Sequence, residues 1–519
     1  MAVSGMVDVQ EAVDQIDRSV VVTERAGPRI RPPLVSVLYG AIALLSAQPI
    51  TWAAGLLTTM FVPRYLDAQA LGQYTVAITI TSLVGTVLGL GLTTSLTRRV
   101  AANPTRAVDD ATAALVLVLG LSIPVAVGLA IVGPWVGVPI DPTTVLPIAL
   151  AGMVVATAQT VLSSVLIGQQ RHARFAWLNG LGVAVTAVAG IAVLMAGGGL
   201  AAYLAVGVGV TALVIVIGWR TAHLGFNLKG VSRTRLLDLA REGLPFLGWN
   251  VATRLRGDIE IGLLAALMTQ QVVGWWGAAT RIIGVPIFIP SLITTPLLPA
   301  LSQHTDDIRI FDQTLRRSLI LVIVLTLPAS AMILALAPEI PSLFGWRAEF
   351  QNSVPLIMVL SMQVPLVSVG MVLGAGLIAI GDERRWLVVN GFATLMTAVG
   401  AWLAITASDS WFHNGAIGAA VVRVLGEVIM IVGALFLLPR GTLDWQTTSL
   451  TVRTVIASTA VVLVASSLGE VSIVLAGAAG GATYAIALLV LRVVRLTEVL
   501  TTVSLARRTM ASRRARARA

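Results

Sequence analysis

Two short stretches of the sequence, far apart in the chain, resemble each other. Residues 70–80 read ALGQYTVAITI, and residues 272–282 read VVGWWGAATRI. Aligned without gaps, the two stretches pair Gly72 with Gly274 and end on the same residue type. Two more pairs of similar segments follow in the same order, 166–180 with 378–391 and 197–203 with 415–421. Three matches in one order predict two copies of one folding unit.

Both copies lie in a chain that is too apolar for a water-soluble protein. Of the 519 residues, 56% are hydrophobic and 12% are charged, whereas a soluble domain carries about 25% charged residues. A helix needs about 20 apolar residues to cross a bilayer, and helices are required because lipid offers no partner to free backbone groups. About fourteen segments are long enough, at 34–62, 73–96, 111–133, 143–167, 174–196, 199–221, 242–267, 271–300, 317–338, 351–380, 386–407, 413–438, 450–468 and 471–493. We therefore predict an all-α polytopic membrane protein, with two six-helix repeats and two further C-terminal helices.

The arginines predict how the bundle is oriented. Of the arginines in the gaps or at the ends of the apolar segments, all but Arg64 and Arg347 fall in alternate gaps or near the two ends of the chain. Cytoplasmic loops carry an excess of positive residues, so both termini are expected in the cytoplasm, which agrees with an even number of spans. Both copies then begin on the same side, and a substrate site is expected between them, near the midplane.

The same segments predict the division of the chain. We expect a disordered cytoplasmic tail, an N-terminal six-helix lobe, a cytoplasmic linker, a C-terminal six-helix lobe, transmembrane helices 13 and 14, and an arginine-rich cytoplasmic tail lying on anionic headgroups. These parts cover residues 1–33, 34–221, 222–241, 242–438, 439–493 and 494–519.

The seventh segment carries charges where lipid would be expected. WNVATRLRGDIEIGLLAALM (249–268) holds Arg254, Arg256, Asp258 and Glu260 near its middle. Each charge at a helix centre costs about 2.5–3.5 kcal/mol, so the four must pair or face water. The spacing i,i+4 suits ion pairs of Arg254 with Asp258 and of Arg256 with Glu260. Because the two pairs lie on nearly opposite faces, one is expected at a cavity and the other against a neighbouring helix, unless the helix is distorted around the glycine between them.

Two other places show the same feature. Arg281 lies about two turns into the eighth segment, and Arg423 and Glu427 form another i,i+4 pair inside the twelfth. Ionisable groups inside a membrane usually mark a pathway. The alternative, that these charges only neutralise one another as folding contacts, stays open.

Three stretches resemble one transporter family. They are FVPRYLDAQALGQYTVA (61–77), RGDIEIGLLAALMTQQVVGWWGAATRI (256–282) and LFGWRAEFQNSVPLIMVL (343–360). Each is similar to a recurring piece of the Wzx-type polysaccharide flippases, which belong to the multidrug/oligosaccharidyl-lipid/polysaccharide (MOP) exporter superfamily. The resemblance implies a transporter of the bacterial cytoplasmic (inner) membrane and not an enzyme. Such a flippase moves a polyprenyl-pyrophosphate-linked oligosaccharide from the inner to the outer leaflet, coupled to an ion gradient.

The resemblance and the charges together predict the site. By position, Asp258 matches the family's acidic residue in the seventh span, and Arg281 matches a basic residue in the eighth. Arginine suits a pyrophosphate because its planar fork binds phosphate oxygens in pairs. We therefore predict substrate binding by arginines and ion coupling by carboxylates. The first group is Arg254, Arg256, Arg281 and Arg423, and the second is Asp258, Glu260 and Glu427.

The expected partners follow from this function. They are the lipid-linked oligosaccharide, membrane lipids, H⁺ or Na⁺ as the coupling ion, and polysaccharide-assembly proteins, with no nucleic acid. No catalytic residue, metal or cofactor is expected, because cysteine is absent and the four histidines lie far apart. Lys229 follows Phe-Asn-Leu and not the glycine of a P-loop, which excludes ATP hydrolysis by that motif.

Four alternatives stay open. A multidrug antiporter of the same superfamily would be expected to have an acidic cavity, whereas the first span contains no carboxylate. A lipid II-type peptidoglycan precursor flippase would be expected to have arginines in the first span, which has none before Arg64. A membrane glycosyltransferase or ligase would need larger loops than this chain has. A scaffold without transport would lack an open cavity.

Overall fold

The computed structural model describes residues 33–135, 140–305, 307–439, 444–469 and 471–493. The two predicted tails, 1–33 and 494–519, lie outside these ranges apart from Pro33, which begins the first helix. Every regular element in the described ranges is a helix, so the predicted all-α class is confirmed.

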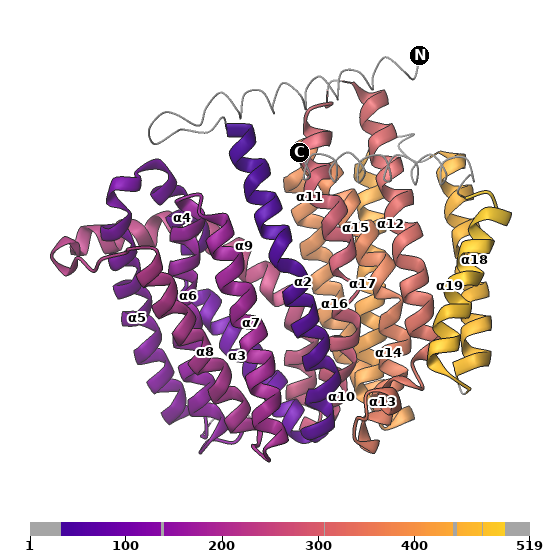
Figure 1. The fold of residues 1–519 in the computed structure, drawn as a ribbon, viewed down its shortest axis with the longest axis horizontal. Helices are drawn as coiled ribbons and strands as arrows, with labels where there is room; N and C mark the ends of the chain where they lie inside the picture. The colour runs from indigo at the N-terminus through magenta and orange to yellow at the C-terminus, as the bar shows by residue number, and fades with distance from the viewer. Residues whose placement is uncertain (1–32, 136–139, 306, 440–443, 470, 494–519) are drawn as a thin grey trace, which may run out of the picture.

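The first half of the chain forms the N-terminal lobe, on the left in Figure 1. Its second predicted span, 73–96, is divided in two, because Leu90 and Gly91 have positive φ angles of 49° and 68° that end a helix. A Cβ on Gly91 would lie 2.3 Å from the carbonyl oxygen of Gly243, so this turn needs glycine to approach the next lobe. The helices are α2 (Pro33–Tyr65), α3 (Ala68–Leu88), α4 (Leu92–Ala102), α5 (Ala107–Val132), α6 (Val145–Gly168), α7 (His172–Met195) and α8 (Leu200–Thr221).

The second half forms the C-terminal lobe, with two more helices along its outer edge (Figure 1). The predicted span 271–300 is bent by 56°, at a break that contains Pro286, which cannot continue a regular helix. The helices are α9 (Arg233–Leu267), α10 (Gln270–Gly284), α11 (Phe288–Ser302), α12 (Ile308–Leu336), α13 (Ile340–Leu343), α14 (Val354–Ser361), α15 (Gln363–Ala379), α16 (Glu383–Phe412), α17 (Gly415–Leu437), α18 (Trp445–Gly469) and α19 (Ile473–Val490). The last two pack together, and α18 packs on α12.

The connection between the lobes is shorter than the predicted linker 222–241. The helix α9 already begins at Arg233, where the Ser232 side chain accepts a hydrogen bond from the backbone N–H of Arg235 (3.2 Å), as an N-cap does. Residues 233–241 are therefore the first turns of α9. The Arg235 guanidinium lies 3.3 Å from the carboxylate of Asp109, which ties these turns to α5.

The number of spans agrees in part with the prediction. Eleven helices in the described part of the chain are long and apolar enough to cross a membrane, or twelve if α10 and α11 form one bent span. The helices α2 and α9 are not among them, although they have 33 and 35 residues and are therefore about 50 Å long. Only if both also cross does the number reach about fourteen, which stays a prediction.

The repeated stretch lies where the two lobes meet. It is contained in α3 and α10, which pack against each other. A Cβ on Gly72 would lie 1.8 Å from the carbonyl oxygen of Gln270, and a Cβ on Gly274 would lie 1.9 Å from that of Ala68. Ala68 and Gln270 are separated by the same offset as the two glycines, so each copy makes the same contact with the other. This reciprocity is what a two-fold relation between the lobes produces.

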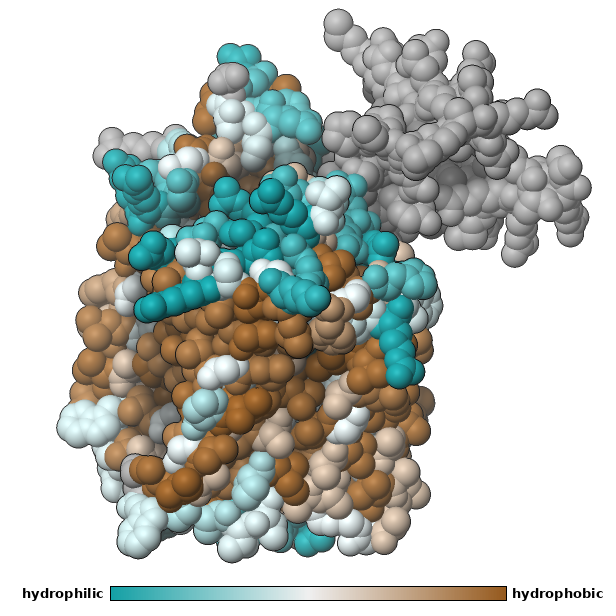
Figure 2. All heavy atoms as spheres, turned by 90° about the vertical axis from the view of Figure 1, so that its left-hand side faces the viewer, coloured by the Kyte–Doolittle hydropathy of each residue, from teal (hydrophilic) through white to brown (hydrophobic). Residues whose placement is uncertain are grey.

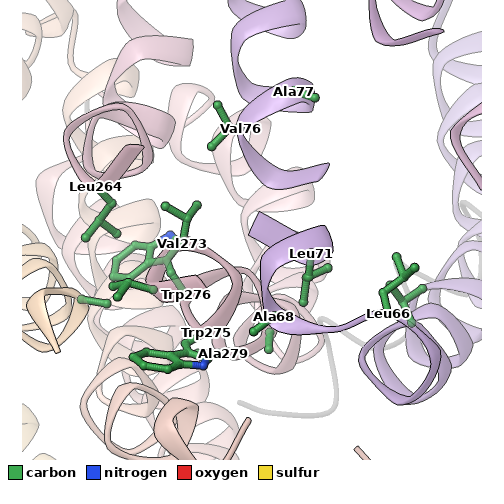
Figure 3. Close-up of a cluster of buried hydrophobic side chains, with 14 of the residues drawn as sticks. Leu66, Ala68, Leu71, Val76, Ala77, Leu264, Val273, Trp275, Trp276 and Ala279 are labelled. Carbon is green, nitrogen blue, oxygen red and sulfur yellow. The ribbon is translucent and has the colours of Figure 1, made fainter. Parts of the chain in front are cut away.

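The lobes share one apolar core at the lower end of Figure 1 and have separate cores at the upper end. The shared core joins side chains of both copies, among them Leu71, Leu264 and Trp276, as Figure 3 shows. Toward the upper end, one cluster contains α4, α5 and α6, and another contains α11, α12 and α15. The large core shared by the two lobes thus lies at the lower end, whereas at the upper end α9 adds Leu239 to the N-terminal cluster.

Two of the three stretches that carry the family resemblance contact each other at this lower end. The Arg347 guanidinium donates to the carbonyl of Tyr65 (2.9 Å), which closes the end of α2. The Glu349 carboxylate accepts from the backbone N–H of Ala68 (2.9 Å), at the start of α3. The indole of Trp346, which is buried, donates to the last turns of α2. These contacts close the lower end between the lobes.

The surface separates a polar end from an apolar belt. On the face formed by the N-terminal lobe, hydrophilic residues gather at the upper end, and hydrophobic residues cover most of the height below, as Figure 2 shows. An apolar belt of this kind matches a surrounding of lipid.

Candidate functional site

The charges in the middle of α9 divide between two places. Arg254 faces the N-terminal lobe: its Nε lies 2.8 Å from Oδ2 of Asp258, and its guanidinium donates to the hydroxyl of Ser82 on α3. The predicted i,i+4 pair of Arg254 with Asp258 is therefore present.

Arg256 faces the other lobe and does not pair with Glu260. Its guanidinium lies 3.1 Å from Glu427 on α17 and donates to the side-chain carbonyl of Asn390 on α16 (2.6 Å). Glu260, which is 2% exposed, instead accepts from Arg423 of α17 (3.3 Å). Among the described residues, the expected pair of Arg256 with Glu260 within α9 and that of Arg423 with Glu427 within α17 are thus replaced by two pairs between these helices.

The direction of the helices explains this exchange. The chain enters α9 at the upper end and returns in α17 from the lower end, so the two helices are antiparallel. Arg256 therefore lies level with Glu427, and Glu260 lies level with Arg423. A pair between helices neutralises the same charges and also holds α9 against α17, which a pair within one helix cannot do.

We predict that this network contributes strongly to stability. Changing Glu260 to glutamine leaves the Arg423 guanidinium with a neutral partner in a buried place, and should lower the free energy of unfolding by about 3 kcal/mol. The double change Glu260→Gln with Arg423→Gln should recover most of this loss, because no charge remains unpaired. Thermal unfolding of the purified protein in detergent measures both.

The matched control is the exposed pair of Asp382 with Arg385, whose arginine side chain is 70% exposed. Asp382→Asn should change the free energy of unfolding by less than about 0.5 kcal/mol. If Glu260→Gln is no more harmful than this control, the network is not a stabilising contact.

Arg281 has a different environment from the other arginines of the site. Its guanidinium lies over the ring of Tyr74 on α3, 5.2 Å from the ring centre, and Tyr74 packs against Tyr203 of α8 at 5.7 Å. Among the described residues no carboxylate forms an ion pair with Arg281, whereas Arg254, Arg256 and Arg423 each have one. Its described neighbours are thus the ring of Tyr74, which attracts a cation weakly, and the uncharged Tyr203 side chain as a hydrogen-bond partner.

Two adjoining cavities border Arg254 and Arg281. The upper cavity, of about 500 Å³, is lined by α3, α4, α6 and α9 and includes Arg254. The lower cavity, of about 480 Å³, is lined by α2, α3, α6, α7 and α8 and includes Arg281 of α10. They share four lining residues, Thr81, Ser82, Met153 and Ala156. The cavities therefore lie mainly inside the N-terminal lobe, and α9 and α10 form the wall toward the second half.

The predicted site residues thus form two groups. Arg254 and Arg281 line the cavities, with Asp258 beside Arg254. The remaining four, Arg256, Arg423, Glu260 and Glu427, pair with one another between α9 and α17.

Sequence reasoning missed the aromatic residues under the arginines. Tyr74 and Trp276 occupy the same position in the two similar stretches. The guanidinium of Arg281 lies 5.2 Å from the ring centre of Tyr74, and that of Arg423 lies 5.8 Å from the ring centre of Trp276. An aromatic residue at the same position in both copies is the signal that could have identified them. The contacts of Ser82 and Asn390 have no comparable signal in the sequence.

Comparisons with known proteins agree with this architecture. The chain matches no curated protein by sequence. Among solved structures it is similar to the lipid II flippase MurJ in an inward closed conformation, with 12% identity and a TM-score of 0.70 over 87% of this chain and 98% of that one. It is also similar to an inward-facing multidrug resistance MATE family transporter of the MOP superfamily, with 20% identity and a TM-score of 0.55 over 76% and 97% of the two chains. These likenesses show the fold. The family described as "Polysaccharide biosynthesis protein" matches residues 37–305, more than half of the sequence, so the chain belongs to that family and has the fold of MOP superfamily transporters.

Proposed function

We propose that the protein is a flippase that moves a polyprenyl-pyrophosphate-linked oligosaccharide from the inner to the outer leaflet of the cytoplasmic membrane. The main support for this proposal is the environment of Arg281. This arginine lines a cavity and has no carboxylate partner among the described residues. An unpaired cation inside a membrane is costly, so it is kept where an anion binds. The family and the fold, which are those of transporters, support the same function.

The chemistry of Arg281 suits a pyrophosphate. The ring of Tyr74 covers one face of the guanidinium, and the Tyr203 side chain is a hydrogen-bond neighbour, while the guanidinium borders the lower cavity where a ligand can meet its other N–H groups. Those groups bind two phosphate oxygens in a fixed fork, and such charge-assisted hydrogen bonds are about twice as strong as neutral ones. A substrate that was itself a cation would be repelled here, which disfavours a multidrug cation antiporter.

Coupling to an ion is assigned to Asp258. In the empty site Asp258 holds Arg254, and a bound H⁺ or Na⁺ at the carboxylate would release this arginine toward the substrate. Glu260 and Glu427, the other predicted coupling residues, are already held by Arg423 and Arg256. We therefore place the exchange at Asp258 and give the other four charges the role of holding α9 to α17.

The orientation belongs to the same proposal. Arginines gather near the upper end, including Arg99 of α4 and Arg316 of α12, and this excess supports a cytoplasmic upper end, where α2 begins and α19 ends. The separate cores at the upper end and the closed lower end then correspond to a cavity that is loaded from the cytoplasm.

The likeness to a lipid II flippase does not extend to the substrate. At 12% identity it shows the fold alone. The part of α2 that lines the lower cavity consists of Ala54, Gly55 and Thr58, which carry no charge. We therefore keep an oligosaccharide carrier as the substrate class.

Cells that lack the protein are predicted to accumulate a lipid-linked oligosaccharide on the cytoplasmic leaflet while its synthesis continues. The precursor is extracted and quantified, and its leaflet is assigned by protection from an external glycosidase in intact cells. Expression of the wild-type protein should restore access to the enzyme. Normal exposure of the precursor without the protein, in a strain that has no second family member, would rule out the proposed function.

A further inference from the structure

The wall of the upper cavity is rich in hydroxyl groups. Eight of its seventeen lining residues are serine or threonine, and they come from four helices, α3, α4, α6 and α9. Each hydroxyl is a polar group inside a chain whose outer face is largely apolar. Polar groups from four helices that meet around one space indicate that the space receives a polar ligand.

The hydrogen bonds of these hydroxyls show what kind of ligand they suit. Thr86 and Thr157 donate to backbone carbonyls of the preceding turn, at 2.7 and 2.8 Å, as do Thr81 and Thr160 at 2.6 and 2.7 Å. A hydroxyl whose proton is already donated still has acceptor lone pairs. This part of the wall therefore accepts hydrogen bonds and favours a ligand that donates several.

The opposite wall, on α9, contains polar groups that are not yet used. The hydroxyl of Thr253 and the amide of Asn250 form no hydrogen bond with the described part of the chain, and both side chains line the cavity. An amide both donates and accepts. Trp249, 56% exposed, adds an apolar ring to the same wall.

Charge distinguishes the upper cavity from the lower one. The one charged residue that lines the upper cavity is Arg254, and its charge is already balanced by the carboxylate of Asp258 at 2.8 Å. The charged residue of the lower cavity, Arg281, has no such partner among the described residues. Hydroxyl acceptors, an amide and an indole ring, without an unbalanced charge, fit a ligand with many hydroxyls and an apolar face. An uncharged sugar has these properties, whereas an acidic sugar would find no free cation here.

We propose that the upper cavity binds the uncharged sugars nearest to the pyrophosphate, while Arg281 in the lower cavity binds the pyrophosphate itself. This inference rests on the proposed function and specifies its substrate. Ser82, which holds Arg254, and Tyr74, which lies under Arg281, are eight residues apart on α3, about 12 Å along its axis. The two cavities join at Ser82, so a pyrophosphate at the lower level leaves the attached sugars at the upper level.

The test compares three lipids on the full-length protein in nanodiscs. They are undecaprenyl pyrophosphate, the same lipid with an uncharged disaccharide, and the same lipid with a disaccharide that contains a uronic acid. The uncharged glycolipid should bind about ten-fold more tightly than the bare lipid, a factor that one or two net hydrogen bonds supply. The acidic glycolipid should bind no more tightly than the bare lipid.

Variants separate the two parts of the inference. Asn250→Leu combined with Thr253→Val should remove the ten-fold advantage of the uncharged glycolipid. Thr459→Val is the matched control, because this threonine is on α18, is exposed and bonds only the preceding turn (3.0 Å). Arg281→Ala should weaken binding of all three lipids.

The binding affinities of the three lipids distinguish a failure of the sugar site from a failure of the proposed function. Equal binding of bare and glycosylated lipids, or an advantage that survives the double change, overturns the sugar site and leaves the proposed function intact. Tighter binding of the acidic glycolipid overturns the choice of an uncharged sugar. If none of the three lipids binds, the proposed function fails, and the sugar site fails with it.

Discussion

Changing Arg281 to alanine is expected to abolish transport while the protein still folds and inserts. The guanidinium lies over Tyr74 at the edge of a cavity and has no carboxylate partner in the described ranges, so its loss leaves no opposite charge unpaired. A paired contact with a pyrophosphate supplies two charge-assisted hydrogen bonds of about 1.5–3 kcal/mol each. Loss of both lowers binding by more than ~100-fold. Flipping of a fluorescent glycolipid in proteoliposomes measures the loss, and size-exclusion chromatography checks the fold.

Replacing Arg281 by lysine tests whether the arginine binds a phosphate through its planar fork or only supplies a positive charge. Arg281→Lys keeps the charge but not the planar fork, and should restore transport only in part. Arg385→Ala, which removes an exposed arginine side chain far from the cavities in sequence, should transport normally. If Arg281→Ala and Asp258→Asn both transport at the wild-type rate, the charges are structural and the mechanism is wrong.

The second large effect is expected at the crossing of α3 and α10. Gly72→Ala would place a methyl group 1.8 Å from a backbone carbonyl of the other lobe, and Gly274→Ala would do the same at 1.9 Å. A backbone atom cannot turn aside as a flexible side chain does, so the lobes must separate. We expect each change to cost more than about 3 kcal/mol, at or above the upper end of overpacking costs. Thermal unfolding of the purified variants measures this.

The control for the crossing is another glycine inside a helix. Gly262 of α9 has nothing within 4 Å of the position that a Cβ would take. Gly262→Ala should therefore be neutral or stabilising by up to about 1 kcal/mol, since alanine is the better helix former. Were Gly72→Ala as stable as Gly262→Ala, the close contact between the lobes would not exist.

Composition and apolar segments were sufficient to predict the class of fold. The membrane surroundings follow from the scarcity of charge, and the two copies follow from the matched stretches that contain Gly72 and Gly274. Both signals are local or nearly local, because they need only the order of residue types. The boundaries were less accurate: the turn at Gly91 and the early start of α9 at Arg233 depend on contacts with other helices.

The sequence by itself determined that this protein is a helical bundle in a membrane, and which ionisable residues lie inside it. Only the tertiary structure decided how those residues are paired. The spacing of Arg256 and Glu260 suits a pair within α9, but each instead meets an opposite charge on α17, since the antiparallel packing places them level. Arg281 looks in the sequence like any arginine in a span, and only the packing of α3 against α10, with Tyr203 of α8 beside Tyr74, leaves it at a cavity with tyrosines for neighbours. The physical reason is that an ion pair depends on distance in space: spacing along one helix limits which residues can meet, and the neighbouring helices decide which of them do.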